Sequence, residues 1–165
     1  MSSGVMVHDD CQSAFKKISG GRHSLRYIIY KIQDKEIVVE TAVAPEDIGG
    51  SKDDYDDNSK IAYSAFVKDL KERTNGFKDC RYAVFDFKFT THRPGAGISK
   101  MDKIIFIQLC PDAAPIKNRM VYASSASAIK SSLGSEKVIQ LQVSDESEIV
   151  YADVLSKLTD KYRDN

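Results

Sequence analysis

The segment Ile104–Leu109 constrains the fold most, because five of its six residues are apolar. A strand with one solvent-exposed face alternates apolar and polar residues, whereas a strand covered on both faces is a continuous apolar run. Six residues are short for a helix and typical of a strand. We therefore expect a central strand here, in a sheet with helices packed on both of its faces.

Composition and alternation predict the other strands. Phenylalanine recurs at every second position near the end of Tyr82–Phe89, an alternation that only a strand uses. Leu25–Ile32 and Ile37–Thr41 are rich in β-branched and aromatic residues, and the four residues between them predict a hairpin. Val138–Val143 alternates apolar residues with glutamines. The glycine-containing stretch Thr91–Asp102 is expected to be a long loop.

Four segments have the apolar spacing of amphipathic helices. They are residues 9–19, Ser59–Arg73, Ile116–Leu133 and Glu148–Tyr162. Asp9 is expected to cap the first of them. The resulting order is α-β-β-α-β-β-α-β-α. It predicts an α/β (α+β) fold in a single domain, residues 1–165, with a mixed five-stranded sheet and helices on both faces.

The helix Ile116–Leu133 carries the most information. Its buried stripe is expected to consist of Tyr122, Ala126, Ile129 and Leu133, and Gly134 is expected to end it. Its opposite face is formed by Lys117, Met120, Val121, Ser124, Ser127, Ala128 and Ser131. Small side chains let another backbone approach closely, and methionine is an adaptable apolar contact. This pattern favours a protein contact, with an ordinary serine-containing surface helix as the alternative.

Charge and cysteine content exclude several classes of protein. Lys+Arg and Asp+Glu number 24 each, so the broad positive field of a nonspecific nucleic-acid-binding protein is missing. The N-terminus lacks the pattern of a secretory signal and no apolar run has the length of a membrane span, so we expect the cytoplasm. The three cysteines have neither the number of a disulfide framework nor the spacing of a zinc site.

Motifs for catalysis or metal binding are incomplete. Asp53–Asp57 suggests a calcium loop, but Asn58 and Ser64 stand where the turn glycine and the bidentate glutamate belong. Gly95–Lys100 lacks the spacing of a phosphate-binding loop, and the three histidines lie in unrelated segments. We expect no metal, no cofactor and no enzyme. A small enzyme with an unrecognised site is the least favoured alternative.

The run Lys117–Ser125 closely resembles the long-helix motif of the ADF/cofilin family. Asp79–Asp86, Cys110–Pro115 and Met1–Val5 support the resemblance in order along the chain. The resemblance implies the actin-depolymerising-factor homology fold. It also implies binding to actin monomers and filaments, preference for the ADP form, filament severing or subunit loss, and slower nucleotide exchange on the monomer.

The resemblance also implies a surface that binds the actin monomer. The implied residues are Ser3, Gly4, Lys117, Arg119, Met120, Ser124 and Ser125. The serine hydroxyls could bond back to earlier carbonyls and bend the helix. Ser3 matches the serine whose phosphorylation inactivates members of the family. Phosphorylation there would place about two negative charges beside the actin contact. A terminal serine without any role is the alternative.

A second implied surface, for the filament, has few cations in this chain. Lys100, Lys103 and Lys157 remain, but Met101 stands where a basic residue is common, and Asp160 follows on the last helix. The family's Lys-Asp pair is replaced by Ala126-Ser127. We therefore expect monomer capture to be stronger than filament severing. Phosphoinositide lipids are implied inhibitors, with Lys117, Arg119 and Lys130 as candidate contacts.

We expect a monomeric protein with actin as its partner. The alternative is an ADF-homology module that binds another cytoskeletal assembly, such as the filament-branching complex. A pull-down from cell extract with and without free actin would separate the two.

Overall fold

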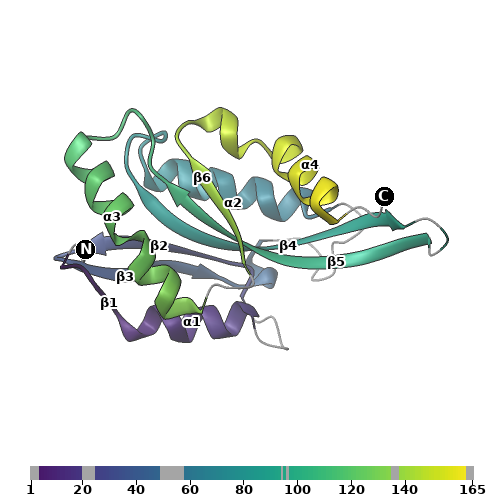
Figure 1. Cartoon of the computed structure of the whole chain (residues 1–165), viewed down its shortest axis with the longest axis horizontal. Coiled ribbons are helices and arrows are strands. Elements are labelled where there is room, and N and C mark those ends of the chain that lie inside the picture. The colour runs from purple at the N-terminus through teal and green to yellow at the C-terminus, as the bar shows by residue number, and fades with distance from the viewer. Residues whose placement is uncertain are drawn as a thin grey trace.

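A computed structural model describes residues 4–19, 25–48, 58–93, 95, 97–134 and 138–162. One mixed sheet has the strand order β1-β3-β2-β4-β5-β6, and four α-helices cover it (Figure 1). The strands are β1 Met6–Val7, β2 Tyr27–Gln33, β3 Glu36–Val43, β4 Arg81–Arg93, β5 Gly97–Leu109 and β6 Ile139–Val143. The helices are α1 Asp9–Ser19, α2 Lys60–Arg73, α3 Ile116–Leu133 and α4 Tyr151–Tyr162, with short 3-10 helices η1 Pro45–Asp47 and η3 Glu146–Ile149. The predicted α+β fold is confirmed.

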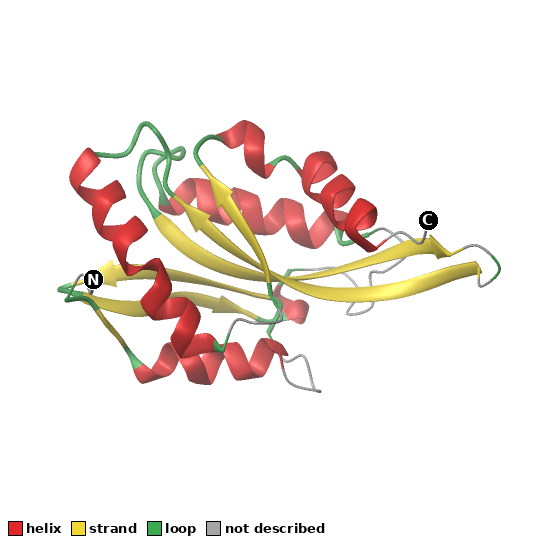
Figure 2. Cartoon of the chain, viewed as in Figure 1, coloured by secondary structure: helices red, strands yellow, loops and turns green. Residues whose placement is uncertain are grey.

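The helices form two layers, with α1 and α3 on one face of the sheet and α2 and α4 on the other (Figure 2). Alternate side chains of β4 point toward the two helix layers. Phe85 and Phe87 pack with α2 and α4, whereas Tyr82 and Val84 pack with α1 and α3. β5 divides in the same way, with Ile105 on one side and Phe106 on the other. The predicted double coverage of this strand is therefore correct.

The sheet has six strands, so the predicted five was wrong. The additional strand, β1, has two residues and pairs in parallel with β3, with Met6 opposite Glu36 and Val7 opposite Ile37. Two residues cannot show an alternation, so its sequence carried no strand signal.

The predicted loop Thr91–Asp102 is also wrong. β4 and β5 pair without interruption from Arg81 opposite Leu109 to Arg93 opposite Gly97. Gly97 has a φ of 75° and lies within a strand, although its sequence suggests a turn. The resulting long hairpin extends beyond the helices at one end of the molecule (Figure 1).

Some element ends differ from the predictions. The first helix is capped by His8 and not by Asp9, because His8 Nδ1 accepts a hydrogen bond of 3.0 Å from the Asp10 N–H. α2 begins at Lys60, since Ser59 has a φ of 62°. The last helix begins at Tyr151 because residues Glu146–Ile149 form the 3-10 helix η3.

The β2–β3 hairpin is confirmed. Its turn consists of Asp34 and Lys35, both with positive φ, as a two-residue turn matched to strand twist requires.

The acidic run Asp53–Asp57 lies outside the described residues. Within the described part of the chain, no group of three or more His, Cys, Asp or Glu side chains could hold a metal ion. No helix among these residues is both long and apolar enough to cross a membrane.

Candidate functional site

The helix α3 packs on the sheet through the predicted apolar stripe. Tyr122, Ala126, Ile129 and Leu133 are all buried. Gly134 ends the helix with a φ of 68°, and its N–H donates to the Ser131 carbonyl at 3.3 Å. One side of α3 is thus fixed, and its opposite side faces outward.

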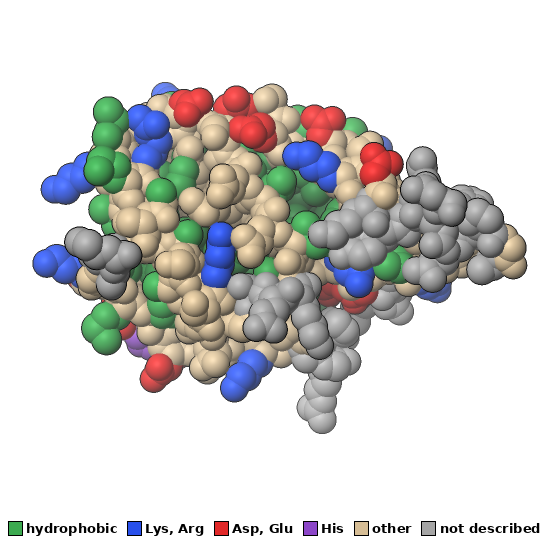
Figure 3. Space-filling model, viewed as in Figure 1, with side chains coloured by type: hydrophobic (Ala, Val, Ile, Leu, Met, Phe, Trp, Pro, Cys, Tyr) green, Lys and Arg blue, Asp and Glu red, His purple; other side chains and the backbone are tan. Residues whose placement is uncertain are grey.

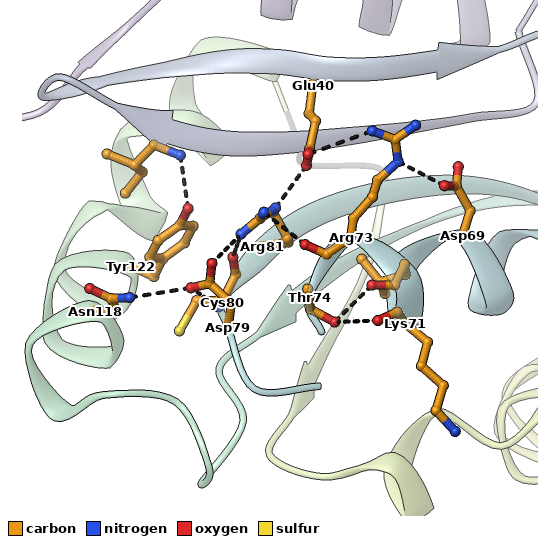
Figure 4. Close-up of polar contacts among 12 residues, drawn as sticks. Glu40, Asp69, Lys71, Arg73, Thr74, Asp79, Cys80, Arg81, Asn118 and Tyr122 are labelled. Carbon is orange, nitrogen blue, oxygen red and sulfur yellow. Dashed lines mark hydrogen bonds and ion pairs between the residues drawn. The ribbon is translucent and has the colours of Figure 1, made fainter. Parts of the chain in front are cut away.

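Polar contacts fix the first half of α3 to the strands. The Ile32 N–H donates to the Tyr122 hydroxyl at 2.9 Å. The Tyr82 hydroxyl donates to the backbone carbonyl of Tyr122. Asn118 donates from Nδ2 to Asp79 Oδ1 at 3.3 Å (Figure 4). These contacts connect the helix to β2 and to the start of β4.

Asp79 belongs to a larger ionic network that joins β3, α2 and β4 (Figure 4). The Arg81 side chain is 10% exposed, and its nitrogens lie 2.9 Å from Asp79 Oδ2 and 2.7 Å from Glu40 Oε1. Glu40 also lies 3.5 Å from Arg73. The β2–β3 register skips Glu40 between Thr41 and Val39, so Glu40 occupies a β-bulge. Bulges re-aim side chains, and this one presents a carboxylate to both arginines.

The outward face of α3 combines apolar and basic side chains. Ile116 and Met120 are 66% and 67% exposed, and Lys117 is exposed between them. β1 packs beside α3 and contributes Met6, which is 71% exposed. Figure 3 shows hydrophobic and basic side chains along this edge of the molecule, one hydrophobic group at the upper left near the start of α3 and another lower, on the side of β1. We call Met6, Ile116, Lys117 and Met120 the α3 surface.

The predicted monomer-face residues divide into exposed and buried ones. Lys117, Met120 and Ser124 are exposed. The Ser124 hydroxyl donates to the Val121 carbonyl at 3.2 Å, so the predicted bond back along the helix is present there. Ser125 is fully buried, so it does not lie on the exposed face with Lys117 and Met120, and its role in actin binding stays a prediction. Arg119 is half-buried and donates from Nε to the Ala114 carbonyl at 3.2 Å.

Two of the predicted contact residues, Ser3 and Gly4, are near the N-terminus. Ser3 lies outside the described residues, so only Gly4 can be placed. Gly4 is exposed and has a φ of 79°. Val5 and Val7 pack against the core under α1 and α3, which leaves Met6 pointing outward. Met6 and Ile116 were missed in the sequence, since a single apolar residue at an element end gives no periodic signal.

The predicted filament-face lysines are not brought together on one face of β5. Met101 and Ile105 pack toward α2 and α4, so by alternation Lys103 shares their side and Lys100 the other. Met101 is partly buried against that core. Lys157 is exposed on α4, on the side of the sheet opposite α3.

The three predicted phosphoinositide contacts do not form one site. Lys130 lies thirteen residues after Lys117, which is about 20 Å along a helix that rises ~1.5 Å per residue. Its Nζ also lies 5.8 Å from the centre of the Phe106 ring, over the sheet. Lys117 instead borders a groove of about 360 Å³ with Lys31, Asn118 and Tyr122.

Comparison with known proteins points to one family. The family model described as "Cofilin/tropomyosin-type actin-binding protein" matches residues 4–159. Actin-depolymerizing factor 1, isoforms a/b, of Caenorhabditis elegans is 60% identical over 156 residues, which cover 94% of this chain and 74% of that protein. Cofilin of Schizosaccharomyces pombe is 38% identical over 164 residues, covering 96% and 98%. The solution structure of the ADF-like UNC-60A protein of Caenorhabditis elegans superposes with a TM-score of 0.83 at 59% identity, covering both chains completely.

Proposed function

The chain belongs to the ADF/cofilin family of actin-binding proteins, and from this premise we propose that it promotes actin depolymerisation by binding actin through the α3 surface. The observation that carries the proposal is the exposure of Ile116 and Met120, which lie one helical turn apart on α3, beside exposed Lys117. Exposed apolar side chains grouped with polar ones mark protein contact sites. Aliphatic contacts of this kind supply the centre of an interface, and cations its rim.

The α3 surface is suited to a partner because its support is rigid. Tyr122 and Asn118 hold the helix to the strands through side-chain hydrogen bonds, so the outward residues keep their spacing without ordering on contact. A preorganised surface loses less entropy on binding. Gly4 extends this surface at the N-terminal end, and Ser124 extends it along the helix.

The protein acts, in this proposal, as a monomeric cytoplasmic binding protein without catalysis or cofactor. It binds actin monomers and filaments, with preference for the ADP form. Monomer capture exceeds filament severing. The division of Lys100 and Lys103 between opposite sides of β5 supports this balance, because it disperses the positive charge of the filament face.

Phosphoinositides are proposed as competing ligands at the start of α3 through Lys117 and Arg119. Anionic headgroups would pair with these cations, and the interaction would weaken with salt. Lys130 is left out of this proposal because its ammonium lies over Phe106.

Phosphorylation of Ser3 is proposed to inhibit actin binding, since it would add about two negative charges to the residue that precedes Gly4 in the chain. Ser3→Glu is expected to weaken actin-monomer binding in a fluorescence titration. Ser13→Glu, on the exposed side of α1, is the matched control. Equal affinities of Ser3→Glu and the unmodified protein would contradict the switch.

Titration of ADP-actin monomers and ADP-actin filaments with single variants tests the main proposal. Met120→Ala and Lys117→Ala are each expected to weaken monomer binding at least about fivefold, which corresponds to the ~1 kcal/mol of a significant interface residue. Ile61→Ala and Lys16→Ala are matched controls, because Ile61 is 57% exposed on α2 and Lys16 is exposed on α1. Unchanged affinity of both test variants would move the contact away from α3.

A further inference from the structure

Two cysteines face each other where the β4–β5 ladder ends. Arg81 pairs with Leu109, so the next pair in the same register is Cys80 with Cys110. The Cys80 N–H donates to Asp79 Oδ1 at 2.8 Å, and the Cys110 N–H donates to the Val143 carbonyl at 2.9 Å. Their backbones are therefore not bonded to each other. Opposed residues of this kind have Cα atoms ~4.5 Å apart, which a disulfide can bridge.

The two thiols act on each other's ionisation. The neighbouring Cys80 thiol, helped by Gln108 and Arg119 and opposed by partial burial, lowers the pKa of Cys110 to about 7. Cys110 and burial together raise the pKa of Cys80. Cys110 is half-buried and Cys80 is buried, so Cys110 is the thiol that a small reagent reaches first.

The third cysteine has a different environment. Cys11 is fully buried, and its thiol donates to the Ile37 carbonyl at 3.3 Å. Burial, followed by nearby carboxylates, raises its pKa to about 12. Thiolates react and neutral thiols do not, so Cys11 serves as an internal comparison for Cys110.

We propose that Cys80 and Cys110 are a redox-active pair that a hydroperoxide converts into an intramolecular disulfide. The Cys110 thiolate attacks the peroxide oxygen and becomes a sulfenic acid, while the O–O bond breaks and the leaving oxygen departs, after protonation, as water or an alcohol. The Cys80 sulfur then attacks the Cys110 sulfur, which forms the S–S bond and releases a water molecule. Two thiols are oxidised and one peroxide is reduced.

Oxidation of the Cys80–Cys110 pair would change the structure only near the start of α3. Both side chains lie in the layer beneath α3, and Arg119 of that helix acts electrostatically on both sulfurs. The pairing geometry is already present across the two strands, so closure of the bond needs little backbone movement. This inference does not depend on actin binding, and its test uses purified protein alone.

Treatment of the folded, reduced protein with hydrogen peroxide, followed by proteolysis and mass spectrometry without reductant, tests the proposal. One crosslinked fragment pair joining Cys80 to Cys110 is expected, with the loss of two hydrogen atoms. Cys11→Ser is expected to give the same product. Cys80→Ser is expected to stop at the Cys110 sulfenic acid, which a dimedone probe traps.

Alkylation gives a second measurement that does not need a variant. The rate at Cys110 is expected to be half-maximal near pH 7, whereas an ordinary thiol is half-ionised at about pH 8.5. Cys11 in the same sample is expected to react at least ~100-fold more slowly until the protein is unfolded in urea. A crosslink that includes Cys11, crosslinks only between molecules, or equal labelling of Cys11 and Cys110 in the folded protein would overturn the proposal.

Discussion

Glu40 shows how one residue can serve several elements. Its position at the β3 bulge places one carboxylate against Arg81 of β4 and Arg73 of α2, with side-chain exposures of 14% for Glu40 and 10% for Arg81. Ion pairs that are mostly buried are strongly destabilised when one partner is removed, because the remaining charge is left poorly compensated. Arg81 would still keep Asp79 and two backbone carbonyls.

Glu40→Ala is therefore expected to lower the free energy of unfolding by about 2 kcal/mol, near the value for a hydrogen bond to a charged group. Lys71→Ala is the matched control, since the Lys71–Glu146 pair has side chains 49% and 57% exposed. The control is expected to lose less than ~1 kcal/mol. Urea unfolding measures both, and similar losses in the two variants would contradict the importance of burial.

Asp86 is a second residue whose environment governs its chemistry. It is fully buried on β4, with Lys88 Nζ 3.8 Å from its carboxylate and with Asp102 as a neighbour. Burial, and then Asp102, raises the pKa of Asp86 to about 8, against the effects of Lys88 and Arg26. An unfolded aspartate has a pKa of ~3.9. Between these values the folded protein binds more protons than the unfolded chain, so stability falls as pH rises.

Asp86→Asn is expected to remove this fall in stability. The wild-type free energy of unfolding should decline by up to ~1.4 kcal/mol per pH unit for the one proton, through the range from about 5 to 8. Asp112→Asn, at an exposed position, is expected to keep the wild-type slope. Parallel pH profiles for the wild type and Asp86→Asn, measured by urea unfolding, would contradict the assignment.

At the scale of an element, α3 depends on Tyr122 for its position. Its hydroxyl accepts from the Ile32 N–H, while its ring packs 5.1 Å from the Tyr82 ring. Tyr151 provides a comparison on α4, because its hydroxyl donates to the Asn58 carbonyl at 2.8 Å on the other side of the sheet. The two tyrosines make similar bonds for different helices.

Tyr122→Phe and Tyr151→Phe are each expected to cost about 1 kcal/mol of stability, the net value of one hydrogen bond. Only Tyr122→Phe should also weaken actin-monomer binding, since it loosens the helix that carries the α3 surface. Chemical unfolding and monomer titration on both variants check this. Equal affinity of the two variants for actin would show that the hydrogen bond does not position the helix.

At the scale of the whole molecule, the two layers separate the α3 surface from Lys157 of the proposed filament contact. α3 covers one face of the sheet and α4 the other (Figure 2). One partner cannot contact side chains on both faces of the sheet at the same time unless it wraps around the sheet. Substitutions on α4 should therefore affect filament binding more than monomer binding, and substitutions on α3 the reverse.

Lys157→Ala on α4 is expected to weaken filament cosedimentation while leaving monomer affinity within about twofold, because Lys157 lies on the side of the sheet opposite the α3 surface. Lys117→Ala should weaken monomer binding. Equal loss of monomer binding in both variants would show that the two layers do not act separately. Vigorous severing of single filaments at submicromolar protein would contradict the proposed preference for monomers.

The sequence was sufficient for features that depend on neighbours along the chain. The stripe from Tyr122 to Leu133 predicted a helix by its period, and the apolar run Ile104–Leu109 predicted a strand by its short length and continuous apolar character. The motif Lys117–Ser125 predicted the family for the same reason, since its residues are contiguous. Gly134 was correctly placed as a helix end by its tolerance of positive φ.

The tertiary structure decided what depends on residues distant in sequence. β1 became a strand because β3 offers it a partner edge, and packing of α3 on the sheet buries Ser125 and places Lys130 over Phe106. Cys80 and Cys110 are thirty positions apart and meet through the β4–β5 register. Pairing and burial arise from packing between elements, and no local period in the sequence records them.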